Sequence, residues 1–300
     1  MSGENSPINL LQFGRSGQLG GELVEALAKE KGFRLAVLGR GDADFTKPQA
    51  IEKAILEAPE LDIVVNTVAY TAVDRAEAEQ ELAHRVNAEA AGQLARACRA
   101  RGVPLIHIST DYVYDGAKSG PYLESDAPGP INIYGQTKLA GEELIRRHVP
   151  AHVILRTSWI FSARGQNFLK TMLRLGAERE EVRVVDDQWG APTSAADLAN
   201  AIITIARQIA GADRPALFGT FHFADAGETS WCGFAEEIFR QARLRARAVP
   251  ISTAEYPTPA RRPLNSRLDT GKISRIFGIH PPSWQTSLAA TLAGMQEKHL

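Results

Sequence analysis

Residues 8–20 read Ile8-Asn-Leu-Leu-Gln-Phe13-Gly14-Arg-Ser-Gly17-Gln-Leu-Gly20, and a helical pattern follows over residues 22–31. A short apolar run, three spaced glycines and a helix make the strand, turn and helix of a dinucleotide-binding unit. Gly14 permits a tight turn, Gly17 lets backbone N–H groups approach a pyrophosphate, and Gly20 lets the helix pack against the strand. A dinucleotide is therefore the expected ligand, and a plain strand-to-helix turn is the alternative.

Apolar, strand-like runs alternate with helical stretches through the first two thirds of the chain. The expected strands lie at 63–66, 105–109 and 153–157, and the expected helices at 76–101, 134–148 and 167–177. This order predicts an α/β protein with a Rossmann-type, doubly wound parallel sheet.

The chain changes in texture after about residue 210, where proline and arginine become more frequent. This change indicates a smaller C-terminal substrate lobe. The lobe is interleaved with the dinucleotide-binding domain, because 182–185 and 195–209 are interpreted as a further strand and helix of the sheet. The predicted dinucleotide-binding domain is therefore 1–157 and 182–212. The predicted substrate lobe is 158–181 and 213–300.

The composition excludes several classes of protein. With 300 residues, 44% hydrophobic content and a net charge of −1, the chain can bury a sizeable core and has no basic excess for nucleic acid. Its apolar runs are too short to cross a membrane, and its start lacks a secretory signal, so a cytoplasmic location is expected. Cys98 and Cys232 stand alone and predict neither a disulfide framework nor a zinc site.

The second strand, expected at 33–38, ends in Gly39-Arg40, where an NAD-binding protein usually carries an acidic residue. Arg40, with Arg15 from the glycine turn, suits the 2′-phosphate of NADPH. NADPH is therefore the expected cofactor. NADH is the alternative, because Asp42 or Asp44 could reach the ribose.

Tyr134 and Lys138 lie four residues apart at the start of a predicted helix, so their side chains share one face. A neighbouring ammonium is expected to lower the pKa of the phenol and make Tyr134 a proton-transfer group. The same spacing also fits two exposed helix residues. Thr110 follows the strand at 105–109, and a hydroxyl, a phenol and an ammonium that converge would make a site for protonating an oxyanion.

Six segments carry a resemblance to a known family over the whole chain. They are Gly14-x-x-Gly17-x-x-Gly20, Ser109-Thr-Asp-Tyr-Val-Tyr114, Tyr134-Gly-Gln-Thr-Lys-Leu-Ala-Gly-Glu142, Arg156-Thr-Ser-Trp159, Asp187-Gln-Trp-Gly-Ala-Pro-Thr193 and Tyr256-Pro-Thr-Pro-Ala-Arg-Arg-Pro-Leu-Asn-Ser-Arg267. The sequence resembles the extended short-chain dehydrogenase/reductase superfamily and, within it, the dTDP-4-dehydrorhamnose reductase family.

The resemblance implies a function and a set of site residues. Hydride would pass from the nicotinamide to the C4 ketone of dTDP-4-dehydro-β-L-rhamnose and give dTDP-β-L-rhamnose. This would be the last step of dTDP-rhamnose biosynthesis, and the product would be a precursor of cell-surface polysaccharide. Tyr134 would donate the proton, Lys138 would bind the nicotinamide ribose, and Thr110 would bind the sugar oxygen. The implied cofactor contacts are Gly17, Gln18, Leu19, Ala69, Tyr70 and Thr71, and the implied substrate contacts are Thr110, Asp111 and Trp159.

Three arginines are candidates for neutralising the substrate pyrophosphate: Arg262, its neighbour Arg261, and Arg267. Of the three, Arg262 is the one expected to bind the substrate. His107 and His222, by contrast, lie in strand-like runs and are interpreted as core residues.

Other activities stay open to different degrees. A dehydratase is disfavoured because Tyr112 stands where related dehydratases have a glutamate. An epimerase, a reductase of another nucleotide sugar and a non-catalytic NADP-binding regulatory subunit are the alternatives. The resemblance also allows a homodimer joined through Mg²⁺, but we identify no carboxylate cluster for it and expect no metal.

Overall fold

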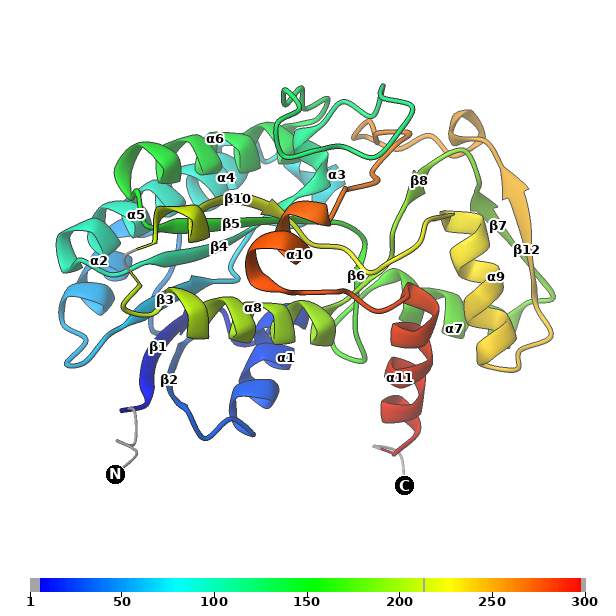
Figure 1. The fold of residues 1–300 in the computed structure, drawn as a ribbon. Coiled ribbons are helices and arrows are strands. Elements are labelled where there is room, and N and C mark those ends of the chain that lie inside the picture. The colour runs from blue at the N-terminus through cyan, green and yellow to red at the C-terminus, as the bar shows by residue number, and fades with distance from the viewer. Residues whose placement is uncertain (1–5, 213, 298–300) are drawn as a thin grey trace.

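The structure, a computed structural model, describes residues 6–212 and 214–297 and is built on a six-stranded sheet (Figure 1). The strand order is β10-β5-β4-β3-β1-β2, and every neighbouring pair is parallel. The strands are β1 (Ile8–Phe13), β2 (Phe33–Leu38), β3 (Ile63–Asn66), β4 (Leu105–Thr110), β5 (His152–Thr157) and β10 (Gly219–His222). Chain order reverses between β1 and β3, which is where open parallel sheets bind their ligands.

Helices cover both faces of this sheet, as Figure 1 shows. One face packs against α1 (Gln18–Leu27), α8 (Ala195–Ile209) and α10 (Gly271–Phe277), and the other against α2 (Pro48–Leu56), α5 (Ala90–Arg101) and α6 (Ile133–His148). The predicted doubly wound α/β architecture is confirmed. None of the helices within 6–212 and 214–297 has the length and apolar content needed to cross a bilayer.

Two strands differ from the sequence-based expectation. Residues 182–185, expected to add a strand to the main sheet, lie in β7 (Glu181–Val185), which pairs with β12 (Arg247–Ile251). The place beside β5 belongs instead to β10, from the segment expected in the substrate lobe. The reason is that β7 alternates between exposed and buried residues, whereas a strand inside a parallel sheet is buried on both faces.

A second group of elements lies beyond the carboxyl ends of the main strands. There β7 and β12 pack with α7 (Phe168–Glu178), α9 (Trp231–Gln241) and α11 (Trp284–Glu297) around an aromatic-rich core (Figure 1). Two short strand pairs lie between this group and the main sheet: β6 (Ile160–Phe161) with β9 (Thr193–Ser194), and β8 (Trp189–Gly190) with β11 (Thr229–Ser230). The division of the chain into two domains at the boundaries given above stays a prediction.

The helix expected over 76–101 is broken into several pieces. They are α3 (Val73–Ala76), α4 (Gln80–His84), the π-helical turn η1 (Arg85–Glu89) and α5. The remaining short helices are the 3₁₀ turns η2 (Asp111–Val113), η3 (Pro215–Leu217) and η4 (Thr253–Glu255). A Cβ at Gly141 of α6 would overlap the main-chain oxygen of Asn87 in η1, so glycine lets α6 lie close against this turn.

Candidate active site

The glycine turn between β1 and α1 has the shape that its sequence predicted. Gly14 has a φ of +95°, and a Cβ there would lie 2.5 Å from Thr67 Oγ1. A Cβ on Gly20 would lie 2.5 Å from the main-chain oxygen of Gly14, whereas one on Gly17 would meet no atom within 4 Å. Gly17 is the N-cap of α1 and makes no side-chain cap, so the first N–H groups of the helix are available to an anion. The turn therefore fits a dinucleotide pyrophosphate.

Gln12, in β1, supports this turn and was not predicted from the sequence. Its side chain is fully buried, and its amide nitrogen donates to the main-chain oxygens of Gly14 at 2.6 Å and Gly20 at 2.8 Å. These bonds brace both ends of the turn. The signal in the sequence was a polar residue between the apolar Leu11 and Phe13 of the strand.

A cavity of about 420 Å³ opens at the carboxyl ends of β1, β3, β4 and β5. Most of the expected site residues line it, from the glycine turn, the loop after β3, the end of β4, helix α6 and the loop after β5. Its lining comprises Ser16, Gly17, Gln18, Leu19, Gly20, Thr67, Ala69, Thr71, Ile108, Ser109, Thr110, Asp111, Tyr134, Lys138, Thr157, Ser158, Trp159, Ile160, Gly165 and Gln166. The predicted glycine turn and the predicted catalytic group thus face one space.

Arg15, in the glycine turn after β1, and Arg40, which follows β2, lie outside this lining. Both are exposed. A Cβ built on Gly39 would lie 3.7 Å from Arg15 Nη2 and 3.7 Å from Asp42 Oδ2, so the Arg15 guanidinium reaches the turn that carries Arg40. Asp42, a residue that could reach the ribose of NADH, accepts a 2.9 Å hydrogen bond from the Gly39 N–H. Its carboxylate is therefore held by the main chain.

Tyr70, an expected cofactor contact, does not line the cavity, and its main chain and side chain both bond residues outside it. The phenol donates to Glu79 Oε2 at 2.5 Å, and the Tyr70 N–H donates to Asn87 Oδ1 at 2.8 Å. Ala69 and Thr71, on either side, line the cavity. Asn87 also donates to Thr137 Oγ1 at 3.1 Å, so it joins the loop after β3 to helix α6.

Tyr134 and Lys138 come from the first two turns of α6, which Asn132 caps by accepting from the Gly135 N–H at 2.8 Å. Lys138 Nζ is buried and donates to the main-chain oxygen of Ile108 at 2.6 Å. Burial lowers the pKa of Lys138 to about 8, although Glu142 acts against this shift.

The expected fall in the pKa of Tyr134 is wrong for this structure. Burial raises the pKa of Tyr134 and Asp111 adds to the rise, while a hydrogen bond with Thr110 opposes it. Desolvation of the phenolate outweighs any help from Lys138, whose Nζ donates to the main-chain oxygen of Ile108 and contacts His107 Nε2. Tyr134 is therefore a firmly protonated phenol, which makes it an acid rather than a base at neutral pH.

Thr110 and Asp111 follow β4 and lie close together. Thr110 Oγ1 donates to Asp111 Oδ1 at 2.9 Å. Burial raises the pKa of Asp111 to about 6. Thr157, paired with Thr110 in the β4–β5 register, was predicted only as the end of a strand; its buried Oγ1 has no hydrogen-bond partner among the described residues. Thr157 is thus a second hydroxyl available to a ligand.

Trp159 has an unusual backbone and a supported ring. Its φ is +48°, in the left-handed region that non-glycine residues rarely adopt. The indole stacks on Trp231 with ring centroids 3.7 Å apart, and a Cβ on Gly190 would lie 2.6 Å from Trp159 Cε2. The segment 187–193, one of the six that carry the resemblance, therefore supplies the glycine that makes room for Trp159.

A second cleft of about 810 Å³ lies on the other side of Trp231, between α7, β7 and β12. Arg262 lines this cleft rather than the first cavity, and its guanidinium donates to both carboxylate oxygens of Asp74, at 2.9 and 2.7 Å. Arg267 instead holds Glu228, Asn265 and the main chain of Ser119. Of these two candidate arginines, only Arg262 lines either space.

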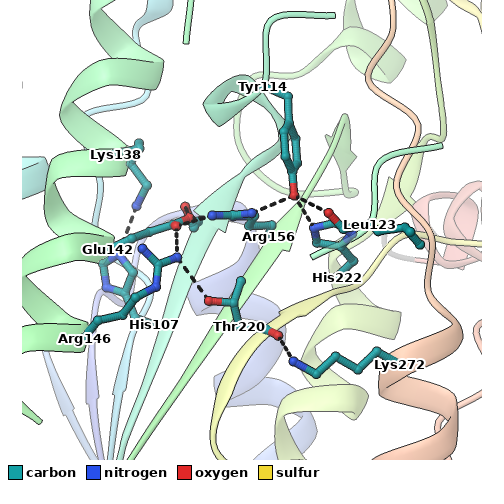
Figure 2. Close-up of polar contacts among 11 residues, drawn as sticks. His107, Tyr114, Leu123, Lys138, Glu142, Arg146, Arg156, Thr220, His222 and Lys272 are labelled. Atoms are coloured by element: carbon teal, nitrogen blue, oxygen red, sulfur yellow. Dashed lines mark hydrogen bonds and ion pairs between the residues drawn. The ribbon is translucent and has the colours of Figure 1, made fainter. Parts of the chain in front are cut away.

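A buried ionic network lies behind the cavity (Figure 2). Glu142, one turn after Lys138, accepts from Arg156 at 2.9 and 2.6 Å, from Ser109 at 2.5 Å and from Arg146 at 2.5 Å. Arg156 also donates to the phenol of Tyr114 at 2.6 Å. This network ties α6 to β4 and β5. His107 and His222 are buried, as their positions in the strands predicted.

No cluster of three or more histidine, cysteine, aspartate or glutamate side chains with the spacing of a metal site occurs within residues 6–212 and 214–297. Cys98 and Cys232 are both free and buried.

Comparisons with known proteins find similar sequences and similar structures. A family model described as the RmlD substrate binding domain matches residues 8–297. The chain is 46% identical over 288 residues to the dTDP-4-dehydrorhamnose reductase of Sinorhizobium fredii, covering 93% of this chain and 95% of that one. The crystal structure of a dTDP-4-dehydrorhamnose reductase from Clostridium acetobutylicum superposes with a TM-score of 0.91 at 36% identity, covering 96% of this chain and 100% of that one.

A second solved structure holds a cofactor. The dTDP-4-dehydrorhamnose reductase of Bacillus anthracis, in complex with NADP, superposes with a TM-score of 0.90 at 36% identity, covering 96% of this chain and 99% of that one.

Proposed function

The chain belongs to the dTDP-4-dehydrorhamnose reductase family, and from this we propose that it reduces the C4 ketone of dTDP-4-dehydro-β-L-rhamnose to dTDP-β-L-rhamnose with NADPH. One observation carries the proposal: the glycine turn and the Tyr134, Lys138 and Thr110 side chains line one cavity. A carbonyl reduction needs a dinucleotide cradle and a proton donor in the same space. The reaction would be the last step of dTDP-rhamnose biosynthesis.

The cofactor contacts follow from the shape of the turn. The N–H groups at the start of α1 would hold the pyrophosphate, and Ala69 and Thr71 would lie along the cofactor. Arg15 from the glycine turn and Arg40 after β2 would pair with a 2′-phosphate, which is why we take NADPH over NADH. The NADP found in the Bacillus anthracis relative supports this choice.

The protonation chemistry follows from the protein's own groups. The bound nicotinamide cofactor supplies the hydride. The raised pKa of Tyr134 keeps its phenol protonated, so it can give a proton to the oxygen at C4 as negative charge develops there. The Thr110 hydroxyl would hold the same oxygen, and Lys138 would hold the ribose. Both groups act mainly by position, because they lie in the cavity before the sugar arrives.

The substrate contacts are assigned in the same way. Asp111 and Trp159 line the cavity and would contact the sugar. The adjoining cleft, at about 810 Å³, is large enough for a nucleotide. Arg262 on its wall would neutralise part of the pyrophosphate, sharing its guanidinium with Asp74.

The test is loss of NADPH absorbance on addition of dTDP-4-dehydro-β-L-rhamnose, generated in place by the preceding reactions, with NADH in a parallel cuvette. Turnover that needs both the enzyme and the sugar supports the reductase. Absence of turnover with retained NADPH binding refutes it and leaves a reductase of another nucleotide sugar or a non-catalytic subunit.

A further inference from the structure

Lys138 stands at the end of a chain of buried polar side chains. The Val68 N–H donates to Asn66 Oδ1 at 2.9 Å, Asn66 Nδ2 lies 3.0 Å from His107 Nδ1, and His107 Nε2 lies 3.2 Å from Lys138 Nζ. Figure 2 shows the last of these contacts. Lys138 Nζ also donates to the main-chain oxygen of Ile108. Asn66, His107 and Lys138 are each 1% exposed, so water does not share these bonds.

The direction of every bond in this chain follows from its first member. A main-chain N–H can only donate, so the oxygen of Asn66 faces Val68 and its NH₂ group faces His107. His107 Nδ1 must then accept. A neutral imidazole carries one proton, which is left on Nε2, and this N–H points at Lys138.

Several titratable groups surround His107 and Lys138. Burial lowers the pKa of His107 well below its usual value, and the charges of Lys138 and His152 add to this effect, so the ring is neutral. Glu142, on the same helix, favours a charged Lys138, whereas burial disfavours it. Tyr134 faces the same cavity as a neutral phenol.

An ammonium has three donors and no acceptor, whereas an amine has a lone pair. The lone pair of a neutral Nζ can accept a hydrogen bond from the His107 Nε2–H. An ammonium cannot accept this bond, so two donors would face each other. We propose that Asn66, acting through the ring tautomer of His107, favours the neutral amine form of Lys138 in the ligand-free chain. Asn66 and His107 are thus positioning residues for Lys138.

The consequence for catalysis rests on the proposed reduction, whereas the protonation state of Lys138 does not. An ammonium that its surroundings destabilise is a stronger acid. Lys138 in its ammonium form therefore gives up a proton more readily than an exposed lysine does, and the His107 N–H accommodates the amine that results.

The experiment is a pH titration of the lysine ¹⁵Nζ signals in the ligand-free full chain, with Lys138 assigned by the loss of its signal in Lys138→Met. We expect Lys138 to titrate well below the exposed lysines. Asn66→Ala frees the His107 tautomer without adding a charge, and should raise the Lys138 midpoint by about one pH unit, the equivalent of one hydrogen bond. In a His107→Phe background the same substitution should have no effect.

The matched control is Asn87→Ala, because Asn87 is also buried and also bonds the loop after β3 and helix α6, but has no contact with His107 among its recorded bonds. It should leave the midpoint unchanged. If Asn66→Ala unfolds the chain, Asn66→Asp serves instead, since its carboxylate accepts from both Val68 and His107 and should raise the midpoint. A Lys138 that titrates with the exposed lysines, or an equal shift in the Asn66 and Asn87 variants, overturns the proposal.

Discussion

Replacing Glu142 with glutamine tests the ionic network that holds α6 against the sheet. The Glu142 side chain is 0% exposed and that of Arg156 is 2% exposed, so the change removes the countercharge of a guanidinium that water cannot reach. Breaking a buried pair on one side costs about 3 to 5 kcal/mol. At about 2.1 cal/mol/K of unfolding entropy per residue, a chain of 300 residues should lose about 5 to 8 °C of Tm.

The assay is thermal unfolding, with Glu143→Gln as the control, because Glu143 is the exposed neighbour on the same helix. The control should stay within about 0.5 kcal/mol of the unsubstituted chain. Burial raises the pKa of Glu142, but Arg156 and Arg146 outweigh it, and the pKa is lowered overall. The stabilisation is therefore complete above the unfolded pKa of about 4.3 and is lost as the pH falls through the folded value, so the gap between wild type and Glu142→Gln should narrow below about pH 4. Equal Tm values for the two variants, or a gap that persists in acid, would refute the reasoning.

Three further changes address the active site. Tyr134→Phe should lower kcat by about 10² to 10⁴ while NADPH binding, followed by fluorescence, stays nearly intact; full activity would remove Tyr134 as the proton donor. Arg40→Ala should raise the KM for NADPH about tenfold more than the KM for NADH, and equal changes would rule out a 2′-phosphate contact. Gly20→Ala should cost about 1 to 3 kcal/mol of stability because its Cβ meets the Gly14 oxygen, whereas Gly17→Ala should keep its Tm and lose NADPH affinity. Similar Tm values for the two glycine variants would contradict the account of the turn.

Much of the fold and of the cavity was predictable from sequence because the signals are local. The run from Ile8 to Gly20 specifies a strand, a turn and a helix by itself, and the topology of a parallel sheet then brings the ends of its strands together. For this reason Thr110 and Tyr134 line the same cavity although they lie apart in the sequence. Gln12 carried only a weak signal, since one polar residue in a strand says nothing about its partners.

What the sequence did not reveal depends on distant partners. Taken alone, residues 182–185 look like a strand of the main sheet. Their alternation of exposed and buried side chains is explained only by the pairing of β7 with β12. The pKa of Tyr134 depends on how completely the surrounding chain excludes water, which its spacing from Lys138 does not encode. The location of Arg40 outside the cavity likewise depends on the path of the chain after β2.

The position of β10 in the sequence, far after its neighbour β5, has a consequence for synthesis of the chain. Every residue of β5 is buried in the finished sheet, and one edge of β5 is covered by β10, which begins at residue 219. A ribosome that adds about 5 to 20 residues per second needs several seconds to produce the intervening segment. During that interval the nascent chain carries an unpaired strand edge, the kind of surface that templates aggregation and recruits chaperones. Slow translation of residues 158–218 would prolong that exposure, so codon choice in this segment should influence the yield of folded protein.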